Sequence, residues 1–421
     1  MTAEIGFVLA LLLVMLFCLM KEVARPDYIV AAALLVLLLS GIITPAQAAR
    51  GFTNEGMWTV ALLFIVAGAV QKSPLLHQFV LRGLGSGKGP KRSILRMMFP
   101  VAGMSAFMNN TPIVVIFTPI IRRWCEERNI SPSKFLMPLS YAAIFGGTLT
   151  LIGTSTNLIV HGFMLDRGMT GFSMFQLAAV GLPATILGVL YMSTIGYRLM
   201  PDHGVWKKTL PKETVPKDME MHWYSYRSIA VILVLAGMIL LAAFQIVSML
   251  QAAAGAVLVL LVTGLIGWKS APRFIQFDVL LLIACAIGIG AAMEQSGAAS
   301  LLAGGLISSS SIFGIIGALA AVYLMTALFT ELITNNAAAV MMFPIAYAAA
   351  VQLGQDPMGF FVAVAIAASA SFSTPIGYQT NFIIYRPGGY RFADYVKVGL
   401  PLNMMYFIVT VSMVSWLWLE T

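Results

Sequence analysis

The chain has 421 residues, of which 59% are hydrophobic and only 10% are charged. So few charged side chains cannot cover the surface of a soluble globule of this length, which excludes a soluble protein and indicates that lipid surrounds most of the exterior. The net charge of +8 would suit a nucleic-acid-binding protein, but the distribution of the basic residues along the chain argues against a nucleic-acid partner.

The apolar residues are gathered in stretches of membrane length. In chain order these stretches occupy residues 5–20, 28–43, 58–70, 172–199, 229–247, 252–267, 279–293 and 392–419. A helix needs about 20 residues to cross the hydrocarbon of a bilayer. The pattern therefore predicts a series of membrane-spanning helices and a lipid bilayer as the surroundings of the protein.

Lys and Arg alternate between the two sides of the expected membrane. Apart from Arg50 and Arg167, every Lys and Arg falls in alternate connections, after spans 1, 3, 5, 7 and 9. Positive residues mark the cytoplasmic connections of membrane proteins. We therefore expect a multi-pass protein of the cell inner membrane with both termini on the outer side.

One apolar region is interrupted by a polar tip. Residues 93–107 and 112–124 are separated by a segment that includes Asn109, Asn110 and Thr111. A helix rises about 1.5 Å per residue, so neither limb is long enough to cross the membrane alone. We expect a re-entrant helical hairpin over about residues 93–124.

A second hairpin is expected over about residues 312–351, with Thr334, Asn335 and Asn336 at its tip. Basic residues surround the first hairpin, whereas residues 274–385 contain none. The first hairpin should therefore open toward the cytoplasm and the second toward the outside. A hairpin returns to the side from which it came, so each half crosses the membrane five times and the second half is inverted.

The two halves also match in sequence, in the same order along the chain. The Gly-Thr-Ser-Thr-Asn segment that begins at Gly153 matches the Gly-Tyr-Gln-Thr-Asn segment that begins at Gly377, and the Val-Gly-Leu-Pro segment at Val180 recurs at Val398. We expect an all-α membrane protein of two inverted repeats, each with five membrane spans and one re-entrant hairpin. The first repeat covers residues 1–199, a cytoplasmic linker residues 200–226, and the second repeat residues 227–421.

Four polar interruptions are expected to meet: the two hairpin tips and two helix breaks, at residues 148–157 and 371–381. In hydrocarbon the freed backbone groups must line a cavity or be packed in protein. The half-helix after a break offers N–H groups that suit an anion, and the half-helix before it offers carbonyls that suit a cation. No Lys or Arg lies in these breaks, so co-bound sodium would supply the charge that a divalent anion needs.

The Asn/Thr tips on opposed hairpins, each followed by a Gly-x-x-Thr-Asn break, resemble the divalent anion:sodium symporter (DASS) family of the ion transporter superfamily, in its bacterial sulfate-type branch. The tips of that family read Ser-Asn-Thr, and only Asn110, Thr111 and Asn335 keep those residue types here. The resemblance implies substrate contacts from both tips, at Asn109, Asn110, Thr111, Thr334, Asn335 and Asn336. It implies sodium sites at Asn110, Gly153, Asn157, Asn335, Gly377 and Asn381. It also implies a homodimer.

Glu331, three residues before the second tip, is a carboxylate inside the expected membrane region. Such a group is a functional candidate, and it could assist a coupled ion or carry a proton. It could equally be a carboxyl group that is hydrogen-bonded within the hairpin, because the matching position of the first half is Ala106. Both interpretations remain open at this stage.

These observations together predict sodium-coupled transport of a small divalent anion by alternating access, with sulfate favoured over a C4-dicarboxylate. The alternatives are a sodium/proton or other oxyanion antiporter of the same superfamily, or an anion channel. An enzyme is not expected, because neither a Gly-x-Ser-x-Gly nor a His-Glu-x-x-His motif occurs. Sodium is the expected co-transported ion, and no organic cofactor is expected.

Overall fold

The computed structural model describes residues 3–71, 89–204 and 226–419, and every regular element in these segments is helical. The helices of the first half are α1 (Ala3–Met20), α2 (Pro26–Leu39), α3 (Pro45–Arg50), α4 (Glu55–Gln71), α6 (Pro90–Ser105), α7 (Asn110–Glu127), α8 (Ser133–Gly147), α9 (Ser155–Asp166), α10 (Ala178–Ser193) and α11 (Ile195–Leu199). Most of the expected linker lies outside the described residues.

The helices of the second half are α12 (Tyr226–Ala243), α13 (Met249–Val262), α14 (Phe277–Gln295), α15 (Ala298–Ser309), α16 (Gly314–Leu332), α17 (Asn335–Gln352), α18 (Pro357–Ser369), α19 (Gln379–Tyr385) and α20 (Phe392–Trp418). Short 3₁₀ turns lie at Gly51–Thr53, Ala271–Phe274 and Ser311–Phe313. The all-α part of the predicted fold class is confirmed for the described residues.

Six helical segments of the described chain are long and apolar enough to cross a membrane. They are Ala3–Met20, Pro45–Val70, Tyr226–Ala243, Phe277–Gln295, Ser311–Leu332 and Phe392–Trp418. Several shorter apolar helices, α2, α10, α13, α15 and α18 among them, lie between these segments. This composition confirms a membrane protein with several apolar helices.

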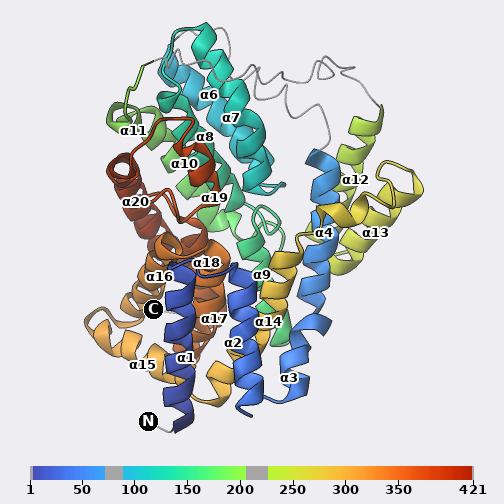
Figure 1. Ribbon diagram of the computed structural model, residues 1–421, viewed down its shortest axis with the longest axis vertical. Helices are drawn as coiled ribbons and strands as arrows, with labels where there is room; N and C mark the ends of the chain where they lie inside the picture. The colour runs from blue at the N-terminus through green and yellow to red at the C-terminus, as the bar shows by residue number, and fades with distance from the viewer. Residues whose placement is uncertain (1–2, 72–88, 205–225, 420–421) are drawn as a thin grey trace.

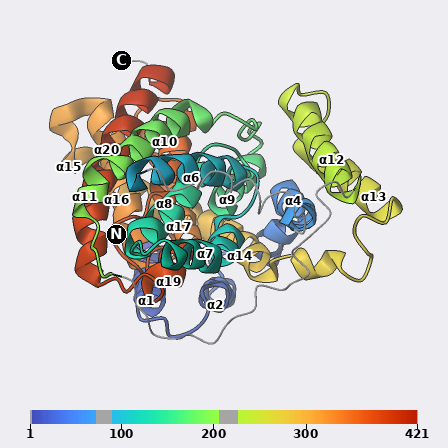
Figure 2. The ribbon, with the colours of Figure 1, turned by 90° about the horizontal axis from the view of Figure 1, so that it is seen from above.

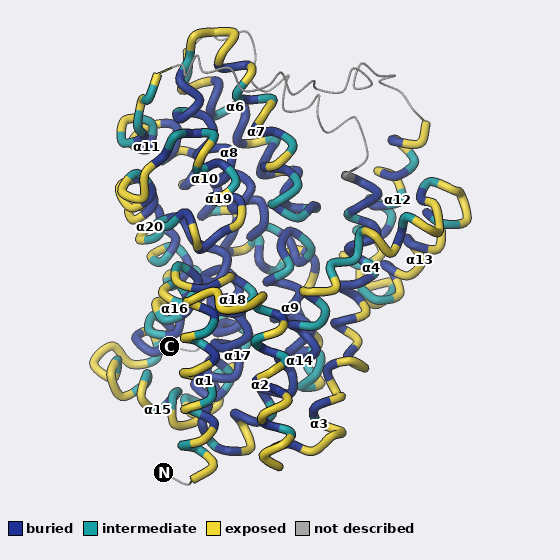
Figure 3. The backbone as a smooth tube through the Cα atoms, viewed as in Figure 1, coloured by how far each residue is buried: buried dark blue, intermediate teal, exposed yellow. Residues whose placement is uncertain are grey.

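The core of the molecule is formed by helices that are buried on nearly every side (Figure 3). In α8 every residue except Lys134 is buried, and in α18 only the first two residues are not. A helix without a polar face is stable only when neighbours surround it. Phe343 of α17 stacks on Phe361 of α18 at 4.3 Å and on Phe163 of α9 at 4.8 Å between ring centroids, which ties three of these helices together.

The two helical hairpins lie toward opposite ends of the molecule. In Figure 1 α6 and α7 lie in the upper half, whereas α16 and α17 lie below the middle. Helices α12 and α13 stand at one side, next to α4, in both Figure 1 and Figure 2. The packed centre therefore lies between the two hairpins, and α4 separates it from the α12–α13 pair.

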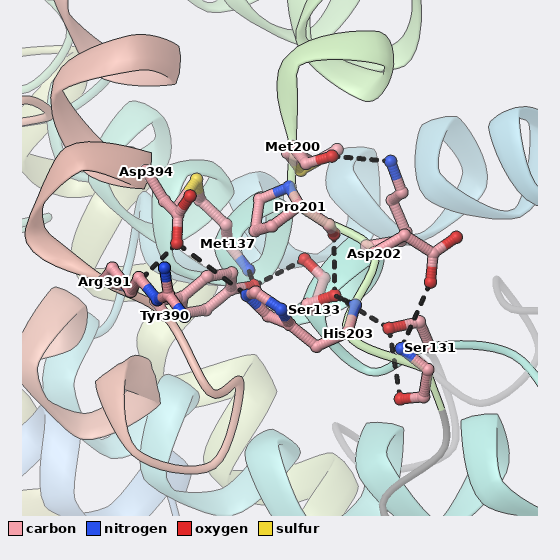
Figure 4. Close-up of polar contacts among 12 residues, drawn as sticks. Ser131, Ser133, Met137, Met200, Pro201, Asp202, His203, Tyr390, Arg391 and Asp394 are labelled. Atoms are coloured by element: carbon pink, nitrogen blue, oxygen red, sulfur yellow. Dashed lines mark hydrogen bonds and ion pairs between the residues drawn. The ribbon is translucent and has the colours of Figure 1, made fainter.

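The start of α8 is held by side chains and backbone from two distant segments (Figure 4). The Tyr390 hydroxyl donates to the Ser133 carbonyl at 2.6 Å and accepts from the Met137 N–H at 2.8 Å. The Ser133 hydroxyl donates to the Pro201 carbonyl at 2.8 Å. The Lys134 ammonium donates to the carbonyl of Tyr197 within α11 and to that of Met200 just after it. These bonds fix the direction in which α8 enters the core.

Arg50 and Arg167, the two basic residues outside the alternating pattern, lie together beside a cavity of about 570 Å³. Arg50 pairs with Asp166 at 2.8 Å between Nε and Oδ1, and Arg167 pairs with Glu294. The Arg167 guanidinium also lies 5.0 Å from the centre of the Tyr347 ring. Each cation is thus matched by a carboxylate, so the two arginines add no net charge to this region.

Two glycines allow the long helices α10 and α20 to contact the backbone of the helix breaks. A Cβ atom at Gly181 would lie 2.2 Å from the Thr148 carbonyl oxygen, and one at Gly399 would lie 2.0 Å from the Phe372 carbonyl oxygen. Both approaches are far inside van der Waals contact. The two breaks are therefore braced in the same way, each by a glycine of the following long helix.

We predict that Gly399→Ala lowers the free energy of unfolding by about 1–3 kcal/mol, because the added methyl group forces the backbone of the break to move. The measurement is thermal unfolding of the purified protein in detergent. Gly255→Ala in α13 is the matched control, since no atom lies within 4 Å of its added Cβ. Equal stability of the two variants would contradict the proposed brace.

Candidate functional site

The two hairpin tips are formed where one helix ends and the next begins. The first tip lies between α6 and α7, which begins at Asn110 with Asn109 as its N-cap residue. The second lies between α16 and α17, which begins at Asn335, and its N-cap Thr334 accepts from the Ala337 N–H at 3.4 Å. The N-termini of α7 and α17 therefore present backbone N–H groups and partial positive charge at the two tips.

Each tip is closed by a hydrogen bond between side chains five residues apart. The Ser105 hydroxyl lies 2.6 Å from the Asn110 amide, and the Thr330 hydroxyl donates to Asn335 Oδ1 at 2.9 Å. The Asn110 side chain is fully buried and that of Asn335 nearly so. The same bond at both tips holds each Asn at the first position of its helix.

The orientation of the Asn110 amide follows from its neighbours. With the oxygen toward Tyr378, Asn110 accepts from the Tyr378 hydroxyl at 2.5 Å. Its nitrogen then donates to the Ser105 hydroxyl and faces the carbonyls of Ala143 and Gly153 at 3.0 and 3.3 Å. Because every polar atom of the amide has a suitable partner in this orientation, we assign it.

The two helix breaks, between α8 and α9 and between α18 and α19, are closed by the same pair of bonds. Asn157 Nδ2 donates to the carbonyls of Gly147 and Thr150, both at 2.9 Å. Asn381 Nδ2 donates to the carbonyls of Ser371 and Thr374, at 3.0 and 3.1 Å.

The carbonyl groups of each break are therefore gathered around one Asn side chain. The remaining amide oxygens of the two Asn residues differ. Asn381 Oδ1 accepts from the Ser140 hydroxyl at 2.7 Å, whereas Asn157 Oδ1 is buried without a partner among the described residues.

Gly153 and Gly377 lie inside these breaks, where no side chain fits. A Cβ atom at Gly377 would lie 2.2 Å from Ser371 Oγ and 2.6 Å from the Thr330 carbonyl oxygen. One at Gly153 would lie 2.8 Å from the Gly147 carbonyl oxygen. The breaks are thus compact loops in which oxygen atoms of the chain lie close to the two glycines.

Each tip contacts the break of the other half. At the first tip Thr111 Oγ1 donates to Gln379 Oε1 at 3.1 Å, close to the Asn110–Tyr378 bond. The structure therefore brings the first tip against the second break.

At the second tip Asn336 Oδ1 accepts from Ser155 Oγ and from Thr156 Oγ1, each at 3.1 Å. Ser155 and Thr156 form the first turn of α9. All four polar interruptions that the sequence indicated thus meet in one place.

The first tip also faces the rest of the molecule across a small cavity of about 20 Å³. Phe107, Asn109 and Ser155 border it on one side. Apolar side chains of α4 and α12 border it on the other. Asn109 therefore lies at the boundary between the tips and the helices α4 and α12.

Tyr378 is the site residue that sequence reasoning missed. Its hydroxyl contacts Asn110, lies 3.5 Å from Thr154 Oγ1 and is within hydrogen-bonding reach of the Asn335 side chain. Tyr378 therefore joins both tips and both breaks. The signal was present in the sequence, because Tyr378 matches Thr154 in otherwise similar Gly-x-x-Thr-Asn segments.

Glu331 accepts four hydrogen bonds, and its partners lie outside its own hairpin. They are the N–H groups of Phe372 and Ser373 at 3.1 and 2.9 Å, the Ser371 hydroxyl at 3.1 Å and the Asn403 amide at 2.7 Å. The carboxylate thus binds the backbone of the second break to α16 and α20. The first half has Ala106 in this place, so only the second break is held by a carboxylate.

The site has neither a fixed cation nor a cluster of metal-binding side chains. In the described part of the chain the ion pairs of Lys and Arg all lie away from the tips. No group of three His, Cys, Asp or Glu residues gathers there in a metal-binding arrangement, as far as the described segments extend. The chemistry of the site is that of amides, hydroxyls, carbonyls and helix ends.

An all-helical membrane protein whose interrupted helices meet in this way has the fold of a secondary transporter. The sequence matches the CitMHS family model, described as a citrate transporter, over residues 14–365. The chain belongs to this family, and the match confirms the resemblance to the divalent anion:sodium symporters. The family and its relatives are transporters and not enzymes.

Two of the curated relatives and one of the solved structures illustrate what the chain is similar to. The probable sodium/sulfate cotransporter 3 of Chlamydomonas reinhardtii is 39% identical over 167 residues, 38% of this chain and 19% of that protein. The sodium-dependent dicarboxylate transporter SdcS of Staphylococcus aureus is 24% identical over 419 residues, 91% of this chain and 80% of that one. The crystal structure of the YdaH transporter of Alcanivorax borkumensis matches with a TM-score of 0.63 at 14% identity, over 88% of this chain and 87% of that chain. This structural match shows the fold alone.

We predict that Glu331→Gln lowers the free energy of unfolding by about 1–3 kcal/mol, because the three bonds to Oε1 lose their charged acceptor and a nitrogen replaces the Oε2 that accepts from the Ser371 hydroxyl. Thermal unfolding in detergent measures this change. Asn403→Ala, which removes one of the four donors and leaves the carboxylate, should cost less. A Glu331→Gln variant as stable as the parent would show that the four bonds do not hold the second break.

Proposed function

We propose that this protein carries a small divalent anion across the cell inner membrane together with sodium ions, by alternating access. The observation that carries the proposal is the meeting of two helix N-termini with two carbonyl-rich breaks, at a place without a fixed cation in the described residues. Helix N-termini attract anions, and clustered carbonyls attract cations. Bringing both to one site lets an anion and cations bind side by side.

The anion is held between the two tips in this proposal. The N-termini of α7 and α17 supply backbone N–H groups, and the tip side chains supply amide and hydroxyl donors. The proposed contacts are Asn109, Asn110, Thr111, Thr334, Asn335 and Asn336. Each helix end contributes only about half an elementary positive charge. An anion with two negative charges can be stabilised by both helix ends at once.

Sodium ions occupy the two breaks. Gly153 and Asn157 provide one site and Gly377 and Asn381 the other, with Asn110 and Asn335 adjoining them. Neutral oxygen ligands suit a hard monovalent cation, and the unpartnered Asn157 Oδ1 is an oxygen of this kind. Because the anion lacks a fixed positive partner, sodium must bind with it, and this requirement couples the two fluxes.

The alternating movement follows from two inverted repeats, residues 1–199 and 227–421, joined by a linker at 200–226. The equivalent bonds of Asn157 and Asn381, and of Ser105 and Thr330, support this division. The hairpins and broken helices move as one body against a scaffold that contains α4, α12 and α13. The first hairpin opens to the cytoplasm, both termini lie outside, and two copies form a homodimer.

Sulfate is the favoured anion and a C4-dicarboxylate the next. One relative is named a probable sodium/sulfate cotransporter and another a sodium-dependent dicarboxylate transporter, so both anions occur among the relatives' names. The segment shared with the sodium/sulfate cotransporter is more similar in sequence, at 39% identity against 24%. This difference supports sulfate.

We predict sodium-dependent uptake of radiolabelled sulfate or succinate by the purified protein in proteoliposomes. Uptake should fall by at least about tenfold when the sodium gradient is removed, because the dianion then lacks its counter-charge. Uptake that is independent of the sodium gradient but depends on a proton gradient would support the antiporter alternative instead. Uptake that never exceeds the equilibrium level would support a channel.

We further predict that Asn110→Ala and Asn335→Ala each abolish uptake while the protein keeps its elution volume and secondary structure. Each substitution removes from a tip the amide that is hydrogen-bonded to Ser105 or Thr330. Thr194→Ala is the control, since its hydroxyl bonds to the exposed end of α10. Wild-type rates in both Asn variants would refute the assignment of the site.

A further inference from the structure

Tyr378 places the bulkiest side chain of the site where the two halves meet. It is the N-cap residue of α19, and only 7% of its surface is exposed. Its hydroxyl lies against Asn110, Thr154 and the Asn335 side chain. No other residue described above contacts both tips.

The residue at the matching position of the first half is Thr154. The Tyr378 hydroxyl lies 3.5 Å from Thr154 Oγ1, so Tyr378 contacts the residue that has its own position in the first half. If two halves are related by a two-fold axis, residues that touch their own counterparts lie at that axis. Tyr378 therefore fills central space that a second Thr would leave open.

The hydroxyl of Tyr378 has one proton, and that proton is already used. In the assigned orientation Asn110 Oδ1 accepts it, while the Asn110 nitrogen faces Ser105 and the backbone. The phenol therefore has no further donor to offer a bound anion. Its effect on the anion must come from the volume of the ring and from the orientation it imposes on Asn110.

We propose that Tyr378 determines which dianion the site admits, by limiting the length of the space between the two tips. This inference rests on the proposed function and names its substrate class. In this proposal sulfate, a compact tetrahedral oxyanion, is small enough to bind beside the Tyr378 ring at the helix N-termini. A C4-dicarboxylate, whose carboxylates are separated by a carbon chain, is excluded by the ring. Tyr378 is thus a specificity-determining residue that acts beside the anion contacts.

The first test compares Tyr378→Thr and Tyr378→Phe with the wild type in proteoliposomes under a sodium gradient. Tyr378→Thr copies the first half and opens the space, so the ratio of kcat/KM for succinate to that for sulfate should rise by about tenfold or more. Steric discrimination between substrates that differ by one methylene is typically about 10- to 200-fold. Tyr378→Phe keeps the ring but frees Asn110, so both kcat/KM values should fall together and their ratio should stay unchanged.

Tyr191→Phe is the matched control. It also removes one hydroxyl, which donates to the Val398 carbonyl at 2.8 Å away from the tips. This variant should keep the wild-type ratio and the wild-type rates. A purely structural role of Tyr378 would change rates or stability without changing the ratio between substrates.

The second test uses the wild type alone, so it does not depend on the folding of a variant. Unlabelled malonate, succinate and glutarate should compete with labelled sulfate progressively less as the carbon chain lengthens. A wild type that takes succinate as readily as sulfate overturns the inference. An unchanged ratio of kcat/KM values in Tyr378→Thr also overturns it. So does a rise of that ratio in Tyr378→Phe as large as the rise expected in Tyr378→Thr. Absence of sodium-dependent uptake of either anion by the wild type would instead refute the proposed function.

Discussion

A polar backbone group in the interior of a bilayer has no water to bind, so it needs a partner within the protein. Two hairpin tips and two helix breaks interrupt helices in the described part of the chain, and each is held by hydrogen bonds from nearby side chains. Asn157 and Asn381 each bind two carbonyls of their breaks, and Ser105 and Thr330 each bind the Asn that begins the next helix. Because these bonds use short side chains, the breaks are compact enough to meet. The tips and breaks themselves contain no Lys or Arg, and the Glu331 carboxylate contacts the second break.

The two halves hold their interruptions with equivalent hydrogen bonds, but they differ at particular positions. Glu331 holds only the second break, since its counterpart is Ala106, and Tyr378 stands opposite the smaller Thr154. Asn381 Oδ1 has a serine partner, whereas Asn157 Oδ1 has none among the described residues. The two sodium sites of the proposed function would therefore have different surroundings, with more hydrogen-bond partners at the second break than at the first.

Much of this arrangement could be predicted from the sequence, because it depends on local rules. A polar Asn/Thr segment between two short apolar limbs predicts a helix interruption, and α7 and α17 do begin at Asn110 and Asn335. The partners of Glu331 could not be predicted, because Phe372 and Asn403 approach it only through the packing of α16, α18 and α20. The mismatch with Thr154 marked the position of Tyr378, but its contacts with Asn110 and Thr154 could not be predicted for the same reason. A side chain that crosses between halves leaves no trace in the periodicity of its own segment.

The electrostatics of the site limit what it can bind. An anion with two charges is stabilised in low dielectric only when positive charge lies within a few ångströms. The arginines nearest to the ends of α9 and α3, Arg167 and Arg50, are already paired with Glu294 and Asp166, and the tips have only helix ends and amides. In the proposed function, cations from solution would therefore complete the balance before the site is moved through the membrane. A site holding the anion alone would be too costly to bury, so the empty or the fully loaded site would be the form that crosses.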